Sequence, residues 1–358
     1  MTILQPMIAA TADPAKVPWA EGLVVSLPAH AASGADPVAA LDRLRLARAF
    51  TELQPTSSRL PFSYQSVPMG LRTLVGGMIG RLKRRQQNSW AAFPRYPIDL
   101  SADYFADLLG LGPSPFATGA TPVLLSHDLD TAEGLTNAVA LFAPLEEKYG
   151  ARSASYIVPC AWPIDQGQLG ALQRRGHEIG IHGFDHSNRT PYAEAAERKA
   201  RLGAAQPLIE RYGITGYRAP SLVRTRPLLE DLAGLYKYDS SIPTSGGLFP
   251  VPNNGCASAR PFMVCDIWEI PLSMPRDGSL RFLGYAPEEI FNIWCKSADL
   301  IGRSGGVVSL LTHCERRFSG NPPMLKVYER FLNHLAESGR FVFSNSGEIL
   351  ARVSRGRI

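Results

Sequence analysis

Two pairs of polar side chains have spacings that suit metal-assisted acid–base chemistry. His182 and His186 are four residues apart, which places two imidazoles on one side of a helical turn and within reach of one metal ion. Asp128 and Asp130 are two residues apart, so both carboxylates point to the same side of an extended strand. One carboxylate of such a pair can bind a divalent cation while the other stays free as a general base. Together the two pairs predict a site for a divalent metal ion.

Each pair also has a structural explanation that needs no metal. Gly183 follows His182 where the helix of a zinc metalloprotease carries Glu, which excludes that class of enzyme. The two histidines alone could be ordinary buried or surface residues. Asp128 and Asp130 could lie in a solvated turn or cap a helix that begins after them. The combination of the two pairs favours metal chemistry over these alternatives.

Two further residues could take part in acid–base chemistry. Arg218 precedes Ala219-Pro220, and a rigid X-Pro segment can hold a guanidinium in fixed geometry against a carboxylate. The alternative for Arg218 is a surface salt bridge. His313 follows a run of apolar residues, so we expect it at the rim of a pocket, where burial affects its pKa. The alternative for His313 is a core histidine with its hydrogen bonds satisfied.

The elements that must position these side chains are parallel strands. From Pro122 onward, short apolar runs alternate with longer amphipathic stretches, a pattern typical of βαβ units and a mostly parallel sheet. Six or seven such units favour a barrel over an open sheet. The candidate residues follow these runs, and the C-terminal strand ends form the active-site face of parallel α/β folds. The apolar runs begin near Val123, Ser155, Glu178, Ile267, Val307 and Phe341.

The order of these motifs resembles the polysaccharide deacetylase family (NodB-type, carbohydrate esterase family 4), in its Asp-x-Asp branch. The resemblance covers about residues 122–345, and the ordered set of five motifs is more specific than any one of them. It implies a distorted (β/α) barrel with six or seven parallel strands. The matching stretches are Asp128-Leu129-Asp130, His182-Gly-Phe-Asp-His186, Arg218-Ala-Pro, Tyr238-Asp239-Ser-Ser and Leu311-Thr312-His313.

The resemblance also implies roles for the candidate residues. Asp130, His182 and His186 would be the ligands of a divalent metal, which in this family is usually zinc. Asp128 would be the general base, and Arg218 would orient it.

On the opposite side of the site, His313 would be the general acid. Asp239 stands where the family carries an Asp that tunes this acid, although the Trp that usually follows is absent.

Two departures from the family pattern concern the substrate. Leu129 separates the two aspartates, and Ser221 stands where many polysaccharide-active members have an aromatic residue. We predict a metal-dependent hydrolase that removes an N-acyl group, in the first instance N-acetyl, from an amino sugar or a nucleotide- or lipid-linked glycan intermediate. The alternatives are a hydrolase of non-sugar amides or cyclic imides, and a catalytically silent barrel that binds a ligand.

Composition and simple sequence patterns restrict the class of protein, its partners and its compartment. The chain has 358 residues, a net charge of +5 and 45% hydrophobic residues, which excludes a disordered chain. It carries no zinc-finger, RNP or helix-turn-helix pattern, so we expect no nucleic-acid partner. The five cysteines form no CxxC pair, and the N-terminus lacks the pattern of a signal peptide. We therefore expect a cytoplasmic protein with reduced thiols, and the sequence leaves its oligomeric state open.

Residues 1–120 are expected to form an N-terminal extension of mixed structure, packed on or near a catalytic barrel at 121–358. Within the extension, residues 69–86 carry five basic residues and no acid. Two explanations are open for the apolar stripe in this segment: packing on the barrel, or peripheral contact with the anionic inner face of a membrane. Three glycines weaken the expected helix. The stripe follows helical spacing through Leu71, Leu74, Val75, Met78, Ile79 and Leu82.

Overall fold

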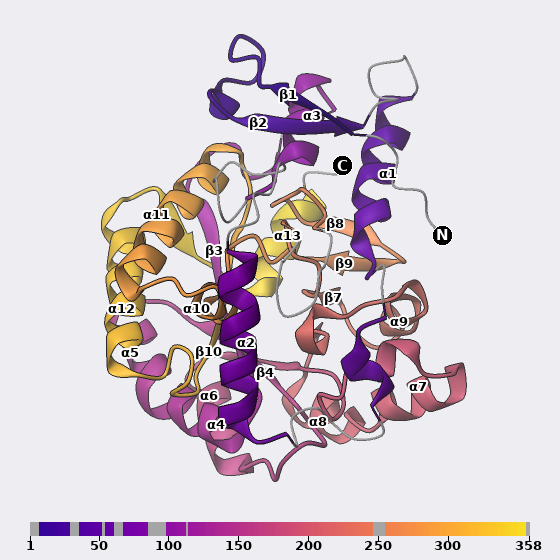
Figure 1. Ribbon diagram of the computed structural model, residues 1–358, viewed down its shortest axis with the longest axis vertical. Coiled ribbons are helices and arrows are strands. Elements are labelled where there is room, and N and C mark those ends of the chain that lie inside the picture. Colours follow the sequence, from indigo (N-terminus) through magenta and orange to yellow (C-terminus); the bar gives the residue numbers. More distant parts are fainter. Residues whose placement is uncertain are drawn as a thin grey trace.

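The computed structural model describes residues 7–28, 36–51, 54–60, 67–84, 98–111, 114–245 and 255–355. Its centre is a nine-stranded sheet in the order β10-β3-β4-β5-β6-β7-β9-β8, with β11 paired to β3 (Figure 1). Only the β8–β9 pair is antiparallel among the described strands of this sheet. The strands are β3 (Thr121–Leu129), β4 (Ser153–Ile157), β5 (Glu178–Ile181), β6 (Gly216–Tyr217), β7 (Tyr238–Asp239), β8 (Phe262–Val264), β9 (Ile267–Glu269), β10 (Val308–His313) and β11 (Phe341–Phe343).

The sheet curls through 222° into a half-barrel with helices around it, which confirms the expected distorted (β/α) barrel. The strands from β10 to β9 along the sheet are mutually parallel. Strands β6 and β7 have two residues each, too few to produce a periodic pattern in the sequence. The helices of the barrel are α4 (Ala132–Asn137), α5 (Ala143–Lys148), α6 (Gln166–Arg174), α7 (Ala195–Gly203), α8 (Gln206–Tyr212), α9 (Arg226–Leu232), α10 (Asp277–Phe282), α11 (Pro287–Arg303), α12 (Pro322–Glu337) and α13 (Ser346–Arg355).

Strand β3 is enclosed by the core of the fold. Every residue of β3 and β4 is buried, as expected for parallel strands that are covered on both faces. Phe142, Trp294 and Phe331 belong to the main core cluster and are fully buried. The strand end that carries Asp128 and Asp130 is therefore held by packing along its whole length.

The two edges of the half-barrel are joined by hydrogen bonds outside the strands. The backbone N–H of Val307, just before β10, donates to the carbonyl of Ala259, just before β8, at 2.8 Å. Nη2 of Arg260 donates to the carbonyl of Ser304 at 2.6 Å. We call this junction, residues 258–260 with 304–307, the seam of the half-barrel.

The N-terminal extension reaches this seam. Asp103 accepts hydrogen bonds from Ser258 Oγ at 2.6 Å and from the N–H of Ala259 at 2.8 Å. Asp107 accepts from both terminal nitrogens of Arg260, at 2.8 and 2.7 Å. The extension has the expected mixed structure, with β1 (Met7–Thr11) paired antiparallel to β2 (Val24–Pro28), then α1 (Pro37–Ala49), α2 (Met69–Lys83) and α3 (Ser101–Leu108).

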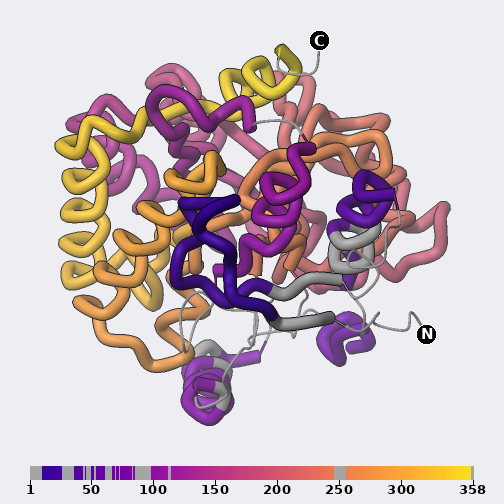
Figure 2. Tube along the Cα trace, turned by 90° about the horizontal axis from the view of Figure 1, so that it is seen from above, coloured from indigo at the N-terminus to yellow at the C-terminus, as the bar shows by residue number. Residues whose placement is uncertain are grey.

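Helix α2 forms despite its glycines, and it packs on α10 through one of them, Gly80. Gly76 and Gly80 are buried, and a Cβ on Gly80 would overlap the carbonyl of Phe282 in α10. The six side chains of the apolar stripe are between 42% and 69% exposed, so the structure contradicts the explanation in which the stripe is buried on the barrel. Figure 1 shows α2 across the front of the barrel, and Figure 2 shows it end-on, projecting from the body of the molecule.

Two further observations concern this segment. Arg85 and Gln86, at the end of the basic stretch, lie outside the described residues. Each helix within the described ranges is too short or too polar to cross a membrane.

Candidate active site

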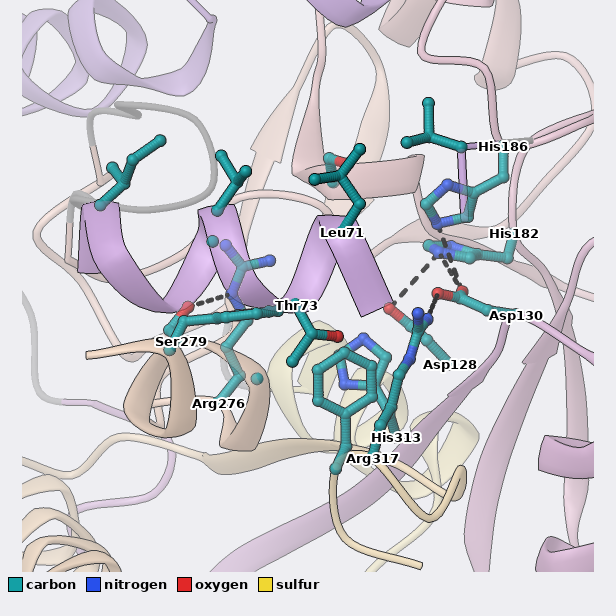
Figure 3. Close-up of a pocket in the computed structure, with 18 residues that line it drawn as sticks. Leu71, Thr73, Asp128, Asp130, His182, His186, Arg276, Ser279, His313 and Arg317 are labelled. Atoms are coloured by element: carbon teal, nitrogen blue, oxygen red, sulfur yellow. Dashed lines mark hydrogen bonds and ion pairs between the residues drawn. The ribbon is translucent and has the colours of Figure 1, made fainter. Parts of the chain in front are cut away.

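Strand register brings the predicted residues to one end of the half-barrel. His313 at the end of β10 is paired with Asp128 of β3. Ile181 at the end of β5 is paired with Tyr217 of β6, so His182 and Arg218 follow neighbouring strands at the same level. These strand ends surround a cavity of about 440 Å³. Its walls include Asp128, Asp130, His182, His186 and His313 (Figure 3).

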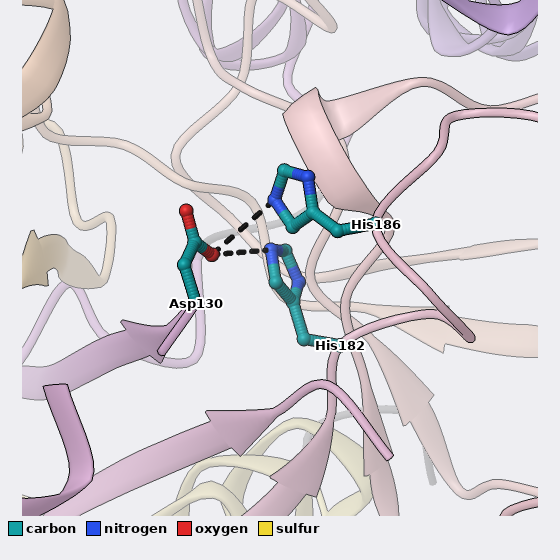
Figure 4. Close-up of side chains that lie close together, drawn as sticks. All are labelled: Asp130, His182 and His186. Carbon is teal, nitrogen blue, oxygen red and sulfur yellow. Dashed lines mark ion pairs between the residues drawn. The ribbon is translucent and has the colours of Figure 1, made fainter. Parts of the chain in front are cut away.

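Asp130, His182 and His186 form a compact set of candidate metal ligands. Their donor atoms all lie within 4.8 Å of one another, and all three residues are buried. Oδ1 of Asp130 lies 3.2 Å from Nε2 of His186 and 3.7 Å from Nε2 of His182 (Figure 4). Within the described part of the chain, this buried oxygen has no hydrogen-bond donor besides that imidazole of His186. Because a buried carboxylate oxygen needs a partner, a cation at this point is chemically reasonable.

The protonation of His182 also fits a metal. Nδ1 of His182 lies 3.0 Å from the carbonyl of Arg218, which can only accept, so Nδ1 carries the hydrogen and Nε2 offers its lone pair toward Asp130. Burial lowers the pKa of His182 to about 4, so its imidazole is neutral at neutral pH. Burial would also lower the pKa of His186, but the Asp130 carboxylate raises it above its usual value. The three residues therefore fit a divalent ion in donor type and proximity, and His182 also fits it in tautomer.

The spacing of the two histidines suggested a helical turn, but in the structure they lie on a loop. His182 follows β5 directly, and His186 has a left-handed backbone with φ of 58°. Gly183 has φ of 70°, and Pro220 fills the space that a Cβ there would need. The turn of the loop, with positive φ at both positions, brings His186 back toward Asp130.

The same loop is held by an arginine from α7. Nη2 of Arg201 lies 2.6 Å from Asp185 Oδ1 and 3.0 Å from Ser187 Oγ, and its guanidinium stacks over Phe184 at 4.4 Å. These contacts flank His186 on both sides in the sequence. They fix the loop from outside the cavity.

Asp128 is held by a hydrogen bond from Arg218. Nη1 of Arg218 donates to Asp128 Oδ1 at 2.9 Å, and Nη2 donates to Ser126 Oγ at 3.0 Å. The guanidinium is fully buried and lies 4.0 Å from the ring centre of Tyr156. Burial would raise the pKa of Asp128, but His182, Arg218 and His313 outweigh it and hold this pKa below its usual value. Asp128 is therefore ionised at neutral pH.

His313 has a different carboxylate partner from the one predicted. Oδ1 of Asp277 lies 2.8 Å from Nδ1 of His313, and Oδ2 accepts from the His313 backbone N–H at 2.8 Å. Burial would lower the pKa of His313, but Asp277, Asp130 and Asp128 raise it to about 9. His313 is therefore a protonated imidazolium at neutral pH. Asp277 begins α10 and shares no motif with His313, so the sequence offered no signal for this pair.

Asp239 does not act on His313, and this prediction is corrected. The Asp239 carboxylate is fully buried and accepts from Ser241 Oγ at 2.6 Å, away from the walls of the cavity. Its other neighbour is Glu269, and burial raises the pKa of both carboxyl groups. Two neighbouring buried carboxyl groups are most stable when they share one proton, so we assign Asp239 a structural role.

The structure adds three charged residues that sequence reasoning missed. Glu315 Oε1 accepts from the Asp130 N–H at 3.1 Å and from Thr131 Oγ1 at 3.0 Å, which fixes the end of β3. Nη2 of Arg317 lies 3.6 Å from Asp130 Oδ2, and Arg276 also lines the cavity. Glu315 and Arg317 follow His313 closely in the sequence, and this closeness was the only signal that could have identified them. Arg276 had none.

Comparison with known proteins supports the fold. No protein-family model matches the sequence, and no curated protein matches it either. Among solved structures, a protein described as a polysaccharide deacetylase from Mycobacterium smegmatis aligns over 67% of this chain and 93% of its own, at 17% identity and a TM-score of 0.55.

Two other solved structures give similar values. A protein described as a polysaccharide deacetylase from Pseudomonas aeruginosa aligns over 68% of this chain and 95% of its own, at 16% identity and a TM-score of 0.51. PuuE allantoinase aligns over 67% and 93%, at 16% identity and a TM-score of 0.52. At such identities the likeness is one of architecture. The chain therefore has the barrel fold of the NodB-type polysaccharide deacetylases.

Proposed function

We propose that this protein is a metal-dependent hydrolase of carbon–nitrogen amide bonds, which removes an N-acyl group, in the first instance N-acetyl, from an amino sugar. One observation carries the proposal. A single cavity holds the set Asp130, His182 and His186 together with an ionised carboxylate, Asp128, and an imidazolium, His313. Amide hydrolysis needs those two groups in those opposite protonation states.

The metal would be held by Asp130, His182 and His186, and zinc suits this donor set of one carboxylate and two imidazoles. When bound, the ion supplies Lewis-acid chemistry by polarising the acyl oxygen and lowering the pKa of water. The remaining steps belong to the side chains around it.

Asp128 takes the proton from the attacking water, and the hydrogen bond from Arg218 at 2.9 Å keeps its carboxylate oriented and ionised. His313 donates its proton to the departing nitrogen, so the acyl group leaves as an acid and the nitrogen as an amine. Asp277 fixes the His313 ring through Nδ1, which leaves Nε2 as the proton donor. Arg218 and Asp277 are positioning residues in this scheme.

A second candidate is hydrolysis of a cyclic ureide or imide on the same machinery. Two features favour it: the similarity in fold to PuuE allantoinase and the modest volume of the cavity beneath α2, about 440 Å³. The amino-sugar proposal is supported by the two neighbours described as polysaccharide deacetylases. Both candidates use the same residues and differ in the substrate.

A panel assay tests both candidates. Protein loaded with zinc is incubated with N-acetylated and N-formylated sugars, sugar nucleotides and chito-oligosaccharides, and in parallel with allantoin and hydantoin. Release of acetate or formate supports the first candidate, and ring opening supports the second. The matched control is Asp128→Asn, which keeps the three ligands. Protein with a full complement of metal that hydrolyses none of these amides would overturn the proposal.

A further inference from the structure

Helix α2 carries a concentration of exposed apolar side chains that the proposed chemistry does not use. Six of the thirteen large hydrophobic side chains that are exposed in the described part of the chain lie on this one helix. Single exposed apolar residues are normal on soluble proteins, whereas a contiguous patch marks an interaction surface. The stripe is therefore a candidate docking surface.

The stripe consists of two rows, each with the four-residue spacing of a helix face. The inner row, Leu71, Val75 and Ile79, lines the cavity that contains the candidate ligands. Figure 3 shows Leu71 on the helix that borders this cavity.

The outer row, Leu74, Met78 and Leu82, does not line the cavity, and its exposed fractions are 62%, 59% and 69%. On the glycine face of the helix, Gly80 packs against α10, and Gly76 is buried and lines the cavity. α2 thus has one face packed on the protein, one face that lines the cavity and one apolar face that is exposed.

The charges of residues 69–86 indicate what kind of partner would cover the exposed row. Residues 69–86 contain Arg72, Arg81, Lys83, Arg84 and Arg85 and no acidic residue. Arg84 anchors the end of the helix: it donates to Glu289 Oε1 at 2.8 Å and to the carbonyl of Gly284 at 2.7 Å. Arg81 is exposed.

Two kinds of occupant could cover an apolar stripe with this charge. A second copy of the chain would bring two clusters of like charge together across the interface. An anionic lipid bilayer offers both an apolar boundary and negative charge, and basic amphipathic helices bind such surfaces. Charge complementarity therefore favours the bilayer.

We propose that α2 docks this protein on an anionic lipid bilayer, with the outer row at the acyl-chain boundary and the inner row as an apolar path into the cavity. Because the two rows share one helix, an apolar chain held in the bilayer could reach the cavity along Leu71, Val75 and Ile79. The substrate class that fits is an amphiphile with a polar N-acyl head group on a long apolar chain. The docking stands on α2 alone, whereas this substrate class rests on the proposed function.

Docking is tested by co-sedimentation of the full chain with vesicles. We expect binding to vesicles of equal parts phosphatidylcholine and phosphatidylglycerol, little binding to pure phosphatidylcholine, and release as salt rises above about 0.1 M, where screening shortens to about 10 Å. The variant Leu74→Gln/Met78→Gln/Leu82→Gln should bind at least about tenfold more weakly, since three apolar side chains leave the interface. These side chains are exposed, so the fold should be kept, as a thermal melt will show.

The matched control is Leu141→Gln/Leu235→Gln/Val342→Gln, which removes exposed apolar side chains elsewhere and should bind like the parent. Equal loss in both triple variants would overturn the proposal, as would no binding to anionic vesicles at low salt. A dimer in sedimentation velocity that the outer-row variant dissociates would show that the stripe is a contact between copies, which also overturns it.

The substrate class is tested with long-chain alkyl N-acetylglucosaminide in the vesicles against soluble methyl N-acetylglucosaminide. We expect kcat/KM to favour the long-chain substrate, and the outer-row variant to lose that preference while hydrolysing the methyl compound as before. Equal kcat/KM values for the two substrates would refute the proposal that the substrate is an amphiphile. Hydrolysis without vesicle binding means that docking fails and the proposed function stands, and vesicle binding without any hydrolysis means the reverse.

Discussion

The pairing of His313 with Asp277 predicts how the alkaline side of the pH–rate profile should respond to one substitution. Asp277→Asn keeps an oxygen that can accept from Nδ1 of His313 but removes the negative charge 2.8 Å away. The pKa of His313 is raised from 6.5 to about 9, with Asp277 the largest opposing influence to burial. Such a shift corresponds to about 3 kcal/mol between the two protonation states of the imidazole.

The expected effect depends on pH. If the pKa of His313 returns to 6.5, the protonated fraction at about pH 8 falls by about thirtyfold, and at about pH 5.5 it hardly changes. The variant should therefore lose the alkaline part of its kcat profile while keeping most of its rate in mild acid. Any loss that is the same at every pH reports misorientation of the ring instead.

Two measurements check this. NMR titration of the His313 imidazole in metal-free protein gives its pKa without any need for activity, and the kcat profile of the metal-loaded protein gives the alkaline limb. The control is Asp239→Asn, which imitates the protonated carboxyl that burial favours at that position, and it should leave the limb in place. An unshifted His313 in Asp277→Asn, or a shifted one in Asp239→Asn, would refute the assignment of the partner.

Further predictions concern the rest of the site. Asp128→Asn should keep stoichiometric metal and lose activity by orders of magnitude, because its carboxylate moves a proton and binds no ion; elemental analysis beside the assay separates the two effects. His186→Ala and Asp130→Ala should both lose most of the metal, and undiminished metal in either would remove that residue from the ligand set. Arg218→Met should destabilise the fold by about 3–5 kcal/mol, since it leaves the Asp128 carboxylate buried without its partner; Asp128→Asn in the same chain should recover part of that loss in urea unfolding. In metal-free protein, His182 alone lowers the unfolding free energy as pH drops from 6.5 toward 4, because its folded pKa is about 4 and the unfolded chain takes up the proton first, whereas Glu315, with its pKa raised to about 7, acts in the opposite direction. Urea unfolding of the parent and of His182→Gln at both pH values isolates the His182 contribution, and an equal change with pH in the two proteins would contradict a neutral, buried His182.

Residues that follow long apolar strands could be placed from the sequence, because their strands determine where they point. Asp128, Asp130, His182 and His313 all follow runs of buried residues, and the structure brings them to one cavity. Asp277 could not be found this way, since its contact with His313 spans 36 residues and depends on how α10 packs.

The apolar stripe of α2 shows a different limit of sequence analysis. Its periodicity indicated which face is apolar, but periodicity carries no information on what covers that face. Of the three glycines expected to weaken the helix, Gly80 is its packing surface, since it lies against the Phe282 carbonyl too closely for any side chain. The loop geometry of His182 and His186 was missed for a related reason, because four-residue spacing is equally compatible with a tight loop at positive φ.

The contacts of α3 with the seam have a consequence for how the chain folds. Asp103 and Ser258 are 155 residues apart in sequence, so this part of the structure cannot form until the chain has been synthesised through the seam and α3 and the seam have been brought together. Until then, Arg260 and the N–H of Ala259 lack their carboxylates, and the neighbouring edge strand β8 is open to pairing with other chains. We expect a protein shortened to begin at residue 121 to aggregate on refolding, and the same protein supplied with residues 98–111 as a separate peptide to recover soluble barrel. The extension would then serve the barrel as an intramolecular chaperone for its last-formed edge.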